Sequence, residues 1–194
     1  TTEITGNVNI NGGSFGTTQS VSVLENSSLN IGSQIIEVNS FTLKGTLDIA
    51  VTNLVKNSSV YEGGQVLVNN ADLSGGKLSF TIAQGLLNKG EKTGDLSVIS
   101  LTNGATGSIS GDVSSIFENN NRYEIQQGSS LGTIIIKNKA SGAEVASQIG
   151  NQNNRNTADA WDKVVFASNT PASKVQEVLN TLSQHNKEGY RQAL

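Results

Sequence analysis

The chain has 194 residues, of which 35% are hydrophobic and 15% are charged, and its formal net charge is −3. A compact enzyme of this length normally has more large apolar side chains and about a quarter charged residues, so the composition favours short strands joined by tight turns. With no Cys and no apolar run of roughly 18 residues, the sequence offers neither a disulfide framework nor a membrane-spanning helix.

Short alternating runs dominate residues 4–138 and predict β-strands, because successive side chains in a strand point to opposite faces. The runs cover residues 4–10 (ITGNVNI), 21–23, 29–31, 35–38, 41–43, 46–51, 65–68 and 77–82. Glycine pairs at 12–13, 63–64 and 75–76 predict turns with positive φ. Asparagines at 69–70 and 119–121 predict further turns, since Asn tolerates left-handed backbone.

Repetition near twenty residues favours a coil of short strands. Leu29 and Leu47 are 18 positions apart, and Leu47 and Leu67 are 20 apart. This period lies in the range of solenoid repeats, in which each turn buries a narrow stripe against its neighbours. The sequence therefore predicts a parallel β-solenoid, although the repeat is imperfect and a two-sheet sandwich remains an alternative.

The pattern changes after residue 83. Residues 96–101 (LSVISL) predict an apolar strand, and residues 123–125 and 133–136 flank a Gly-containing stretch, 126–132, that predicts a hairpin. Placed at the end of a solenoid, this hairpin would cover an edge whose backbone groups could otherwise pair with other chains.

The last part of the chain predicts helices. Residues 150–156 (GNQNNRN) form a polar linker, and Thr170 and Pro171 provide a helix cap and a first helical position. Two amphipathic patterns follow the linker: Ala158, Trp161, Val164 and Val165, then Val175, Val178, Leu179 and Leu182. We therefore divide the chain into solenoid rungs at 1–95, a capping β region at 96–149, and the linker and helices at 150–194.

The order of these parts resembles the C-terminal end of a bacterial autotransporter passenger (type V secretion). The resemblance rests on residues 45–50 (GTLDIA), 123–125 (YEI), 132–134 (GTI), the Asn-rich linker and the final run 189–194 (GYRQAL). It implies an all-β, right-handed parallel β-helix with a capping hairpin and a short α-helical tail, secreted to the outer-membrane surface. In that family the last rungs commonly act as an autochaperone, and a helix leads into a translocator barrel, which this chain lacks.

Residues 128–132 (GSSLG) match the G-x-S-x-G pattern, and Asp159 or Asp162 and then His185 follow in hydrolase order. A nucleophile elbow requires a strand, a sharp turn and a helix, whereas strand-forming residues follow Ser130. A hairpin loop is therefore the favoured interpretation, and His185 is interpreted as an exposed helical residue.

The remaining candidates also favour structural roles. Asp48, Asp72, Asp95 and Asp112 fall in separate turns, so no catalytic pair or metal site is nominated, and no cofactor is expected. Trp161 could anchor a partner, but packing on the solenoid is favoured.

These patterns favour a non-catalytic display segment that supports passenger folding. An adhesin or toxin-like binding surface is the alternative, and a carbohydrate-active enzyme is a third reading that paired Asp residues on adjacent rungs would favour. The expected partners are the chain's own translocator barrel and a receptor on a host or neighbouring cell, with the chain as a monomer. Positive charges are spread along the sequence, so neither nucleic acid nor an anionic membrane is predicted as a partner.

Overall fold

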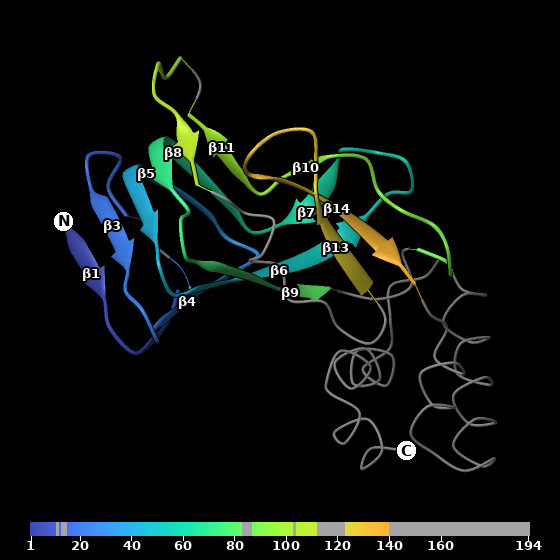
Figure 1. The fold of residues 1–194 in the computed structure, drawn as a ribbon, viewed down its shortest axis with the longest axis horizontal. Helices are drawn as coiled ribbons and strands as arrows, with labels where there is room; N and C mark the ends of the chain where they lie inside the picture. Colours follow the sequence, from blue (N-terminus) through green and yellow to red (C-terminus); the bar gives the residue numbers. More distant parts are fainter. Residues whose placement is uncertain (11, 13–14, 83–86, 103, 112–122, 140–194) are drawn as a thin grey trace, which may run out of the picture.

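The computed structural model describes residues 1–10, 12, 15–82, 87–102, 104–111 and 123–139, and all regular structure in them is β (Figure 1). The described residues include no helix long and apolar enough to cross a membrane. The predicted linker and helices at 150–194 lie outside the described residues, as do Asn119–Asn121.

The strands form three sheets. Sheet A contains β1 (Thr2–Ile4), β3 (Ser20–Val23), β5 (Ile35–Leu43), β8 (Gln65–Asp72), β11 (Ile99–Leu101) and β12 (Ile109–Ser110). Sheet B contains β2 (Asn7–Asn9), β4 (Ser28–Gly32), β6 (Thr46–Leu54), β7 (Tyr61–Gly63) and β9 (Lys77–Ile82). Sheet C contains β10 (Leu96–Ser97), β14 (Thr133–Asn138) and β13 (Tyr123–Gln127).

The chain alternates between sheets A and B, and each pass of one strand in A followed by one in B is called a rung here. The rungs are β1–β2, β3–β4, β5–β6 and β8–β9. Within both sheets, strands of successive rungs pair in parallel. This path is consistent with the predicted β-solenoid and differs from the antiparallel pairing of most sandwiches.

The register confirms one predicted repeat and corrects the other. Leu29 pairs with Leu47, as the 18-residue spacing predicts. Leu47, however, pairs with Leu78, whereas Leu67 lies in sheet A opposite Glu37. The third rung is longer because β7 folds back antiparallel on β6 before the chain returns to sheet A.

Two predicted runs divide between sheets. Residues 4–10 contribute to β1 and β2, which Gly6 separates with a φ of 72°. Residues 96–101 contribute to β10 of sheet C and β11 of sheet A. In contrast, residues 77–82 form β9 with the predicted bounds.

Inward-facing side chains of the rungs stack in columns and form one continuous core with buried residues between 87 and 136. One column runs through Ile4, Val23 and Leu43. A second runs through Leu29, Leu47 and Leu78. Because each rung contributes only a few medium-sized side chains, stability depends on stacking between neighbours. This explains how a chain with 5% aromatic residues can still build a buried core.

The glycine and asparagine predictions are partly wrong. Positive φ occurs at Gly12 and Gly75, but not at Gly63, Gly64 or Gly76, while Gly13 lies outside the described residues. Gly64 is instead required by close packing, because a Cβ there would overlap the carbonyl oxygen of Gly32.

The asparagines that adopt positive φ are Asn26 and Asn57. Asn69 and Asn70 lie within β8, where Asn69 Nδ2 donates to Asn39 Oδ1 of β5 at 3.0 Å. They therefore form no left-handed turn, and Asn70 Oδ1 accepts from the N–H of Ser108, just before β12, at 3.2 Å.

Candidate functional site: the C-terminal cap

The predicted hairpin is confirmed. Strands β13 and β14 pair antiparallel, with Ile125 opposite Ile136, and β10 adds to the other side of β14 through Leu96 and Ile134. We call residues 87–101 together with 123–139 the cap. Its strands β10, β13 and β14 lie on the opposite side of the described strands from β1 (Figure 1).

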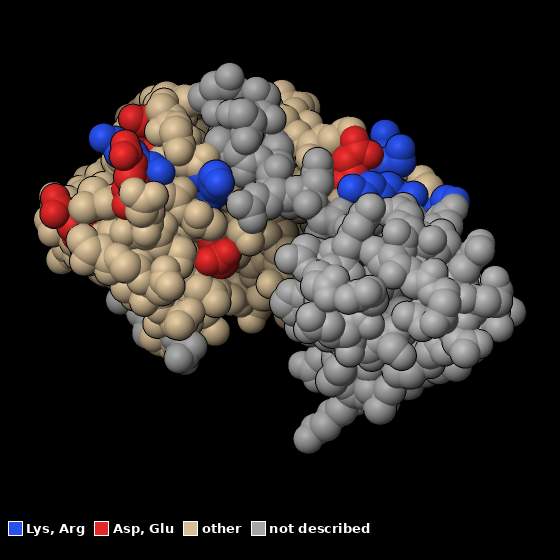
Figure 2. All heavy atoms as spheres, turned by 60° about the horizontal axis from the view of Figure 1, so that its bottom comes forward, with Lys and Arg blue, Asp and Glu red and all other residues tan. Residues whose placement is uncertain are grey.

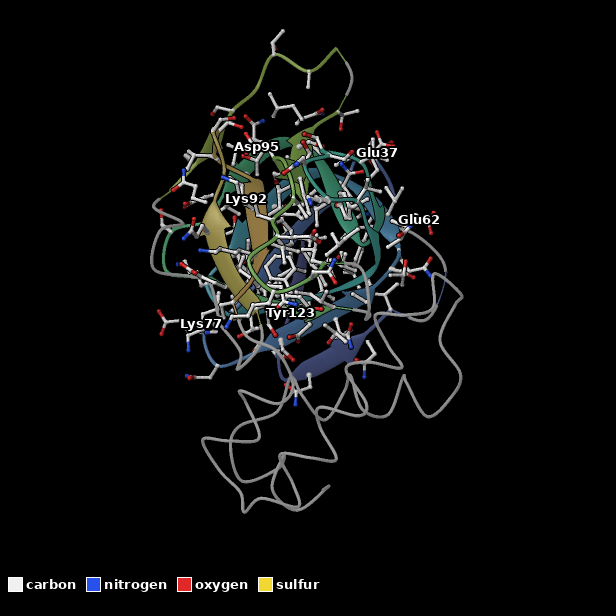
Figure 3. The ribbon with its side chains drawn as sticks, turned by 90° about the vertical axis from the view of Figure 1, so that its right-hand side faces the viewer. Glu37, Glu62, Lys77, Lys92, Asp95 and Tyr123 are labelled. Carbon is white, nitrogen blue, oxygen red and sulfur yellow. The ribbon has the colours of Figure 1, made fainter. Side chains whose placement is uncertain are left out.

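Large apolar side chains fill the inner face of the cap. Tyr123 is 1% exposed and is one of the largest fully buried side chains among the described residues. In the end view its ring lies in the middle of the molecule, enclosed by the surrounding strands (Figure 3). The other buried apolar residues of the cap are Leu87, Leu96, Val98, Ile99, Ile125, Ile134 and Ile136. They belong to the same core as the rungs, so the cap closes the end of that core.

A close backbone contact joins the hairpin to the segment before it. The N–H groups of Val98 and Ile99 both donate to the carbonyl of Gly132 at 3.0 Å. Gly132 has a φ of 84°, and a Cβ there would overlap the carbonyl oxygen of Ile99. A glycine is thus required for this contact. The contact also explains why residues 96–101 break into two strands.

Two buried polar side chains complete the hydrogen bonding of the cap. Thr93 Oγ1 accepts from the N–H of Ile136 at 3.1 Å. Asn138 Nδ2 donates to the carbonyl of Leu87 at 2.8 Å. Both side chains are almost completely buried, at 2% and 0% exposed. Removing either one would leave a buried backbone group without its partner, which is costly.

The cap is also fastened to the loop between β6 and β7. Asn57 N–H donates to the carbonyl of Lys92 at 2.9 Å, and Gly94 N–H donates to that of Ser58 at 2.8 Å. Lys56 Nζ lies 2.7 Å from Glu91 Oε1. The hydrogen bond from Lys56 is the main reason that the pKa of Glu91 lies below its usual range.

Tyr61 links the same region to the rungs. Its hydroxyl lies 2.9 Å from the carbonyl oxygen of Gly64 and 3.0 Å from that of Ser97, so it can donate to either. Gln65 Nε2 donates to the Ser97 carbonyl as well. Burial raises the pKa of Tyr61, which keeps the phenol neutral as a donor.

The serine motif lies in the hairpin loop between β13 and β14, as the sequence analysis favoured, and no helix follows it. Ser130 Oγ lies 3.4 Å from Thr133 Oγ1, a partner that cannot act as a general base. Asp95 Oδ2 accepts from Ser129 N–H at 3.0 Å, and this hydrogen-bonding holds the pKa of Asp95 below its usual value. Asp159, Asp162 and His185 lie outside the described residues.

Two of the candidate carboxylates that the structure describes, Asp48 and Asp72, lie in different sheets. Asp48 is opposite Ser79 and Asn30 in sheet B, whereas Asp72 is opposite Thr42 in sheet A. Asp72 Oδ1 accepts from the N–H of Ser74 at 3.0 Å, and this hydrogen bond stabilises a turn. Hydrogen bonding to Ser74 is also the main reason that the pKa of Asp72 lies below its usual value. Within the described residues no group of three or more His, Cys, Asp or Glu could hold a metal ion, and Asp112 is outside them.

Lysines are the feature that sequence reasoning missed. Residues 56–57, in the loop between β6 and β7, lie next to residues 89–92 of the cap, which in turn lie next to residues 137–139, as backbone hydrogen bonds between these distant segments show. Lys92 also forms an antiparallel bridge with Lys137. Figure 2 shows several basic residues, with acidic ones among them, at the right-hand end of the described surface, besides others at the left. A linear search for charge runs could not find this cluster, because pairing between distant segments creates it.

Comparisons of the chain with models of protein families, with curated proteins and with solved structures found no match.

Proposed function

We propose that this chain is the C-terminal part of a right-handed β-solenoid that is displayed on a bacterial surface, and that its cap supports folding of the rungs. Display at the outer membrane and a partnership with a translocator barrel come from the resemblance to autotransporter passengers. The solenoid interpretation is supported by the alternating path between two parallel sheets.

The observation that carries the folding role is the continuity of the core across the cap. Tyr123, Ile134 and Ile136 pack in the same cluster as the stacked rungs. Neighbour stacking means that a rung gains stability only where a formed surface already exists. The cap provides such a surface, because backbone hydrogen bonds and buried side chains fix its own segments to one another.

A structural rather than catalytic role fits the placement of the polar residues. Ser130 faces Thr133 in a loop, and Asp48 and Asp72 lie in different sheets. These positions offer no nucleophile–base pair and no pair of carboxylates on adjacent rungs. This applies to the residues that the structure describes.

Two neighbouring substitutions in β14 test the folding role. Ile134 is buried and Ile135 is on the opposite face. Ile134→Asp should abolish or strongly delay folding, since burying an unpaired charge costs several kcal/mol. Ile135→Asp, the matched control, should fold close to normally. Refolding followed by circular dichroism and resistance to protease would report both.

The effect of a buried charge should also depend on where in the chain it is placed. Ile4→Asp, in the first rung, should disturb folding less than Ile134→Asp, although Ile4 is also buried. If Ile134→Asp gave a normally refolding, protease-resistant chain, the folding role of the cap would have to be abandoned.

A further inference from the structure

The tripeptide Asn-x-Ser, which is the acceptor sequence for N-linked sugars, occurs in this chain at residues 26–28 and 57–59. Among the described residues, Asn26 and Asn57 are also the two residues other than glycine that adopt positive φ, at 59° and 55°. Each lies in a tight turn that a backbone hydrogen bond of 3.2 Å closes. Both asparagines are exposed, and neither forms a side-chain hydrogen bond with the described residues.

The backbone of such a turn does not require an amide side chain. The turn at residues 73–76 is closed by the same type of hydrogen bond, also of 3.2 Å, and has Gly75 with a φ of 83° at the corresponding position. Glycine adopts positive φ without steric cost. The conformation of the turn therefore does not by itself account for the exposed amide groups of Asn26 and Asn57.

The serines of the first tripeptide have structural roles. Ser27 Oγ accepts from the N–H of Gly6 at 3.0 Å. Ser28 Oγ donates to Asn7 Oδ1 of the neighbouring strand β2 at 2.9 Å. Both hydroxyl groups thus join the second rung to the first, so packing between rungs explains why serines stand at these two positions.

The second tripeptide differs at its last residue. Ser58 Oγ accepts from the N–H of Val60 at 3.0 Å, which stabilises the loop between β6 and β7. Ser59 is exposed, and its hydroxyl forms no hydrogen bond with the described residues. The amide of Asn57 and the hydroxyl of Ser59 define the acceptor sequence, and the described contacts use neither group.

The surroundings of Asn57 also suit a bulky hydrophilic group. Val55 and Val60, on either side of the tripeptide, are 48% and 70% exposed. The backbone of the loop is held to the cap, because Asn57 N–H donates to the carbonyl of Lys92 at 2.9 Å. A sugar on the side-chain amide would therefore break none of the described hydrogen bonds and would shield exposed apolar surface.

We propose that Asn57, and not Asn26, is an acceptor site for an N-linked sugar in the folded protein. The donor is a sugar that carries a phosphate leaving group on its anomeric carbon, and a glycosyltransferase supplies the base. A bond forms between Asn57 Nδ2 and the anomeric carbon while the bond from that carbon to the phosphate oxygen breaks. The phosphate-containing group leaves, and the amide proton passes to the base of the transferase.

Peptide mass spectrometry of the folded 194-residue chain, after incubation with a transferase that reads Asn-x-Ser, tests this proposal. The peptide that contains Asn57 should gain the mass of the sugar, and the peptide that contains Asn26 should not. Synthetic peptides of residues 20–32 and 51–63 should both be modified, because Ser28 is engaged only in the folded chain. Separate reactions with a nucleotide-activated hexose and with a lipid-linked oligosaccharide distinguish the two sources of the sugar.

Ser59→Ala and Asn57→Gln should each abolish transfer to the second tripeptide. Ser28→Ala, the matched control, should leave transfer to Asn57 unchanged, and circular dichroism should show that all three variants fold. In protein isolated from the cells that produce it, Asn57 should carry the sugar. An unmodified Asn57 there, no transfer to Asn57 of the folded chain from either donor, or equal modification of Asn26 and Asn57 would overturn the proposal.

Discussion

The two ends of the molecule close the same core in different ways. At the N-terminal end, β1 and β2 are the first strands of sheets A and B, and each pairs on one side with the next rung. Val8, Ile10 and Phe15 are only partly buried there. At the other end, the cap covers the core with an antiparallel hairpin and with Tyr123, which is almost completely buried.

This difference shows that an inner rung is buried by the rungs on either side of it, whereas the end of the stack needs additional residues to cover it. A rung needs a neighbour on each side to bury its stripe, so the first rung remains incompletely covered. The cap depends less on stacking. Thr93, Asn138 and Gly132 join its segments through specific hydrogen bonds, and Tyr123 fills its interior.

The largest contrast should come from truncating an apolar side chain at each end. Tyr123→Ala should lower the free energy of unfolding by about 3–5 kcal/mol, because it leaves a cavity in a closed core. Val8→Ala should cost about 1 kcal/mol or less, since that side chain is only partly buried. Urea denaturation measures both values. Equal losses would show that the first rung is packed as firmly as the cap.

A smaller effect should come from the buried hydroxyl of the cap. Thr93→Val keeps the shape of the side chain but leaves the N–H of Ile136 without its acceptor, which should cost about 1–3 kcal/mol. Thr81→Val on the exposed face of β9 is the control and should change stability by less than about 0.5 kcal/mol. If the Thr93→Val variant were as stable as the control, the hydrogen bond to Thr93 would not contribute to the difference in stability between the cap and the first rung.

The smallest effect concerns pH and the hairpin loop. The pKa of Asp95 is lowered in the folded protein, so its contribution is present at neutral pH and is lost as the pH falls through that lowered pKa. In an NMR titration the Ser129 amide should therefore respond with a midpoint below 3.8, the ordinary value for Asp. Asp95→Ala should abolish this response. A midpoint above the ordinary value would contradict the hydrogen bond between Asp95 and Ser129.

The sequence predicted strands better than it predicted their partners. Alternation located β9 and the hairpin, because burial of one face fixes a period of two along each strand. It could not reveal that Leu47 pairs with Leu78, because the inserted β7 changes the length of that rung.

Long-range contacts account for the features of the cap that were missed. Thr93 and Asn138 gain their roles from partners 43 and 51 positions away. Lys92 and Lys137 likewise come together from segments that are distant in the sequence. Close backbone approach explains Gly64, where the sequence suggested only a turn.

Native-state hydrogen exchange, resolved along the chain, tests the central claim most directly. If the cap is the most stable part and supports the rungs, amides in β14 and in residues 96–101 should exchange more slowly than those in residues 1–30. We expect this order of exchange rates because the cap closes its end of the core and is hydrogen-bonded internally, whereas the first rung is covered by another rung on one side only. Faster exchange in β14 than in β1 and β2, with the chain fully folded, would contradict the account.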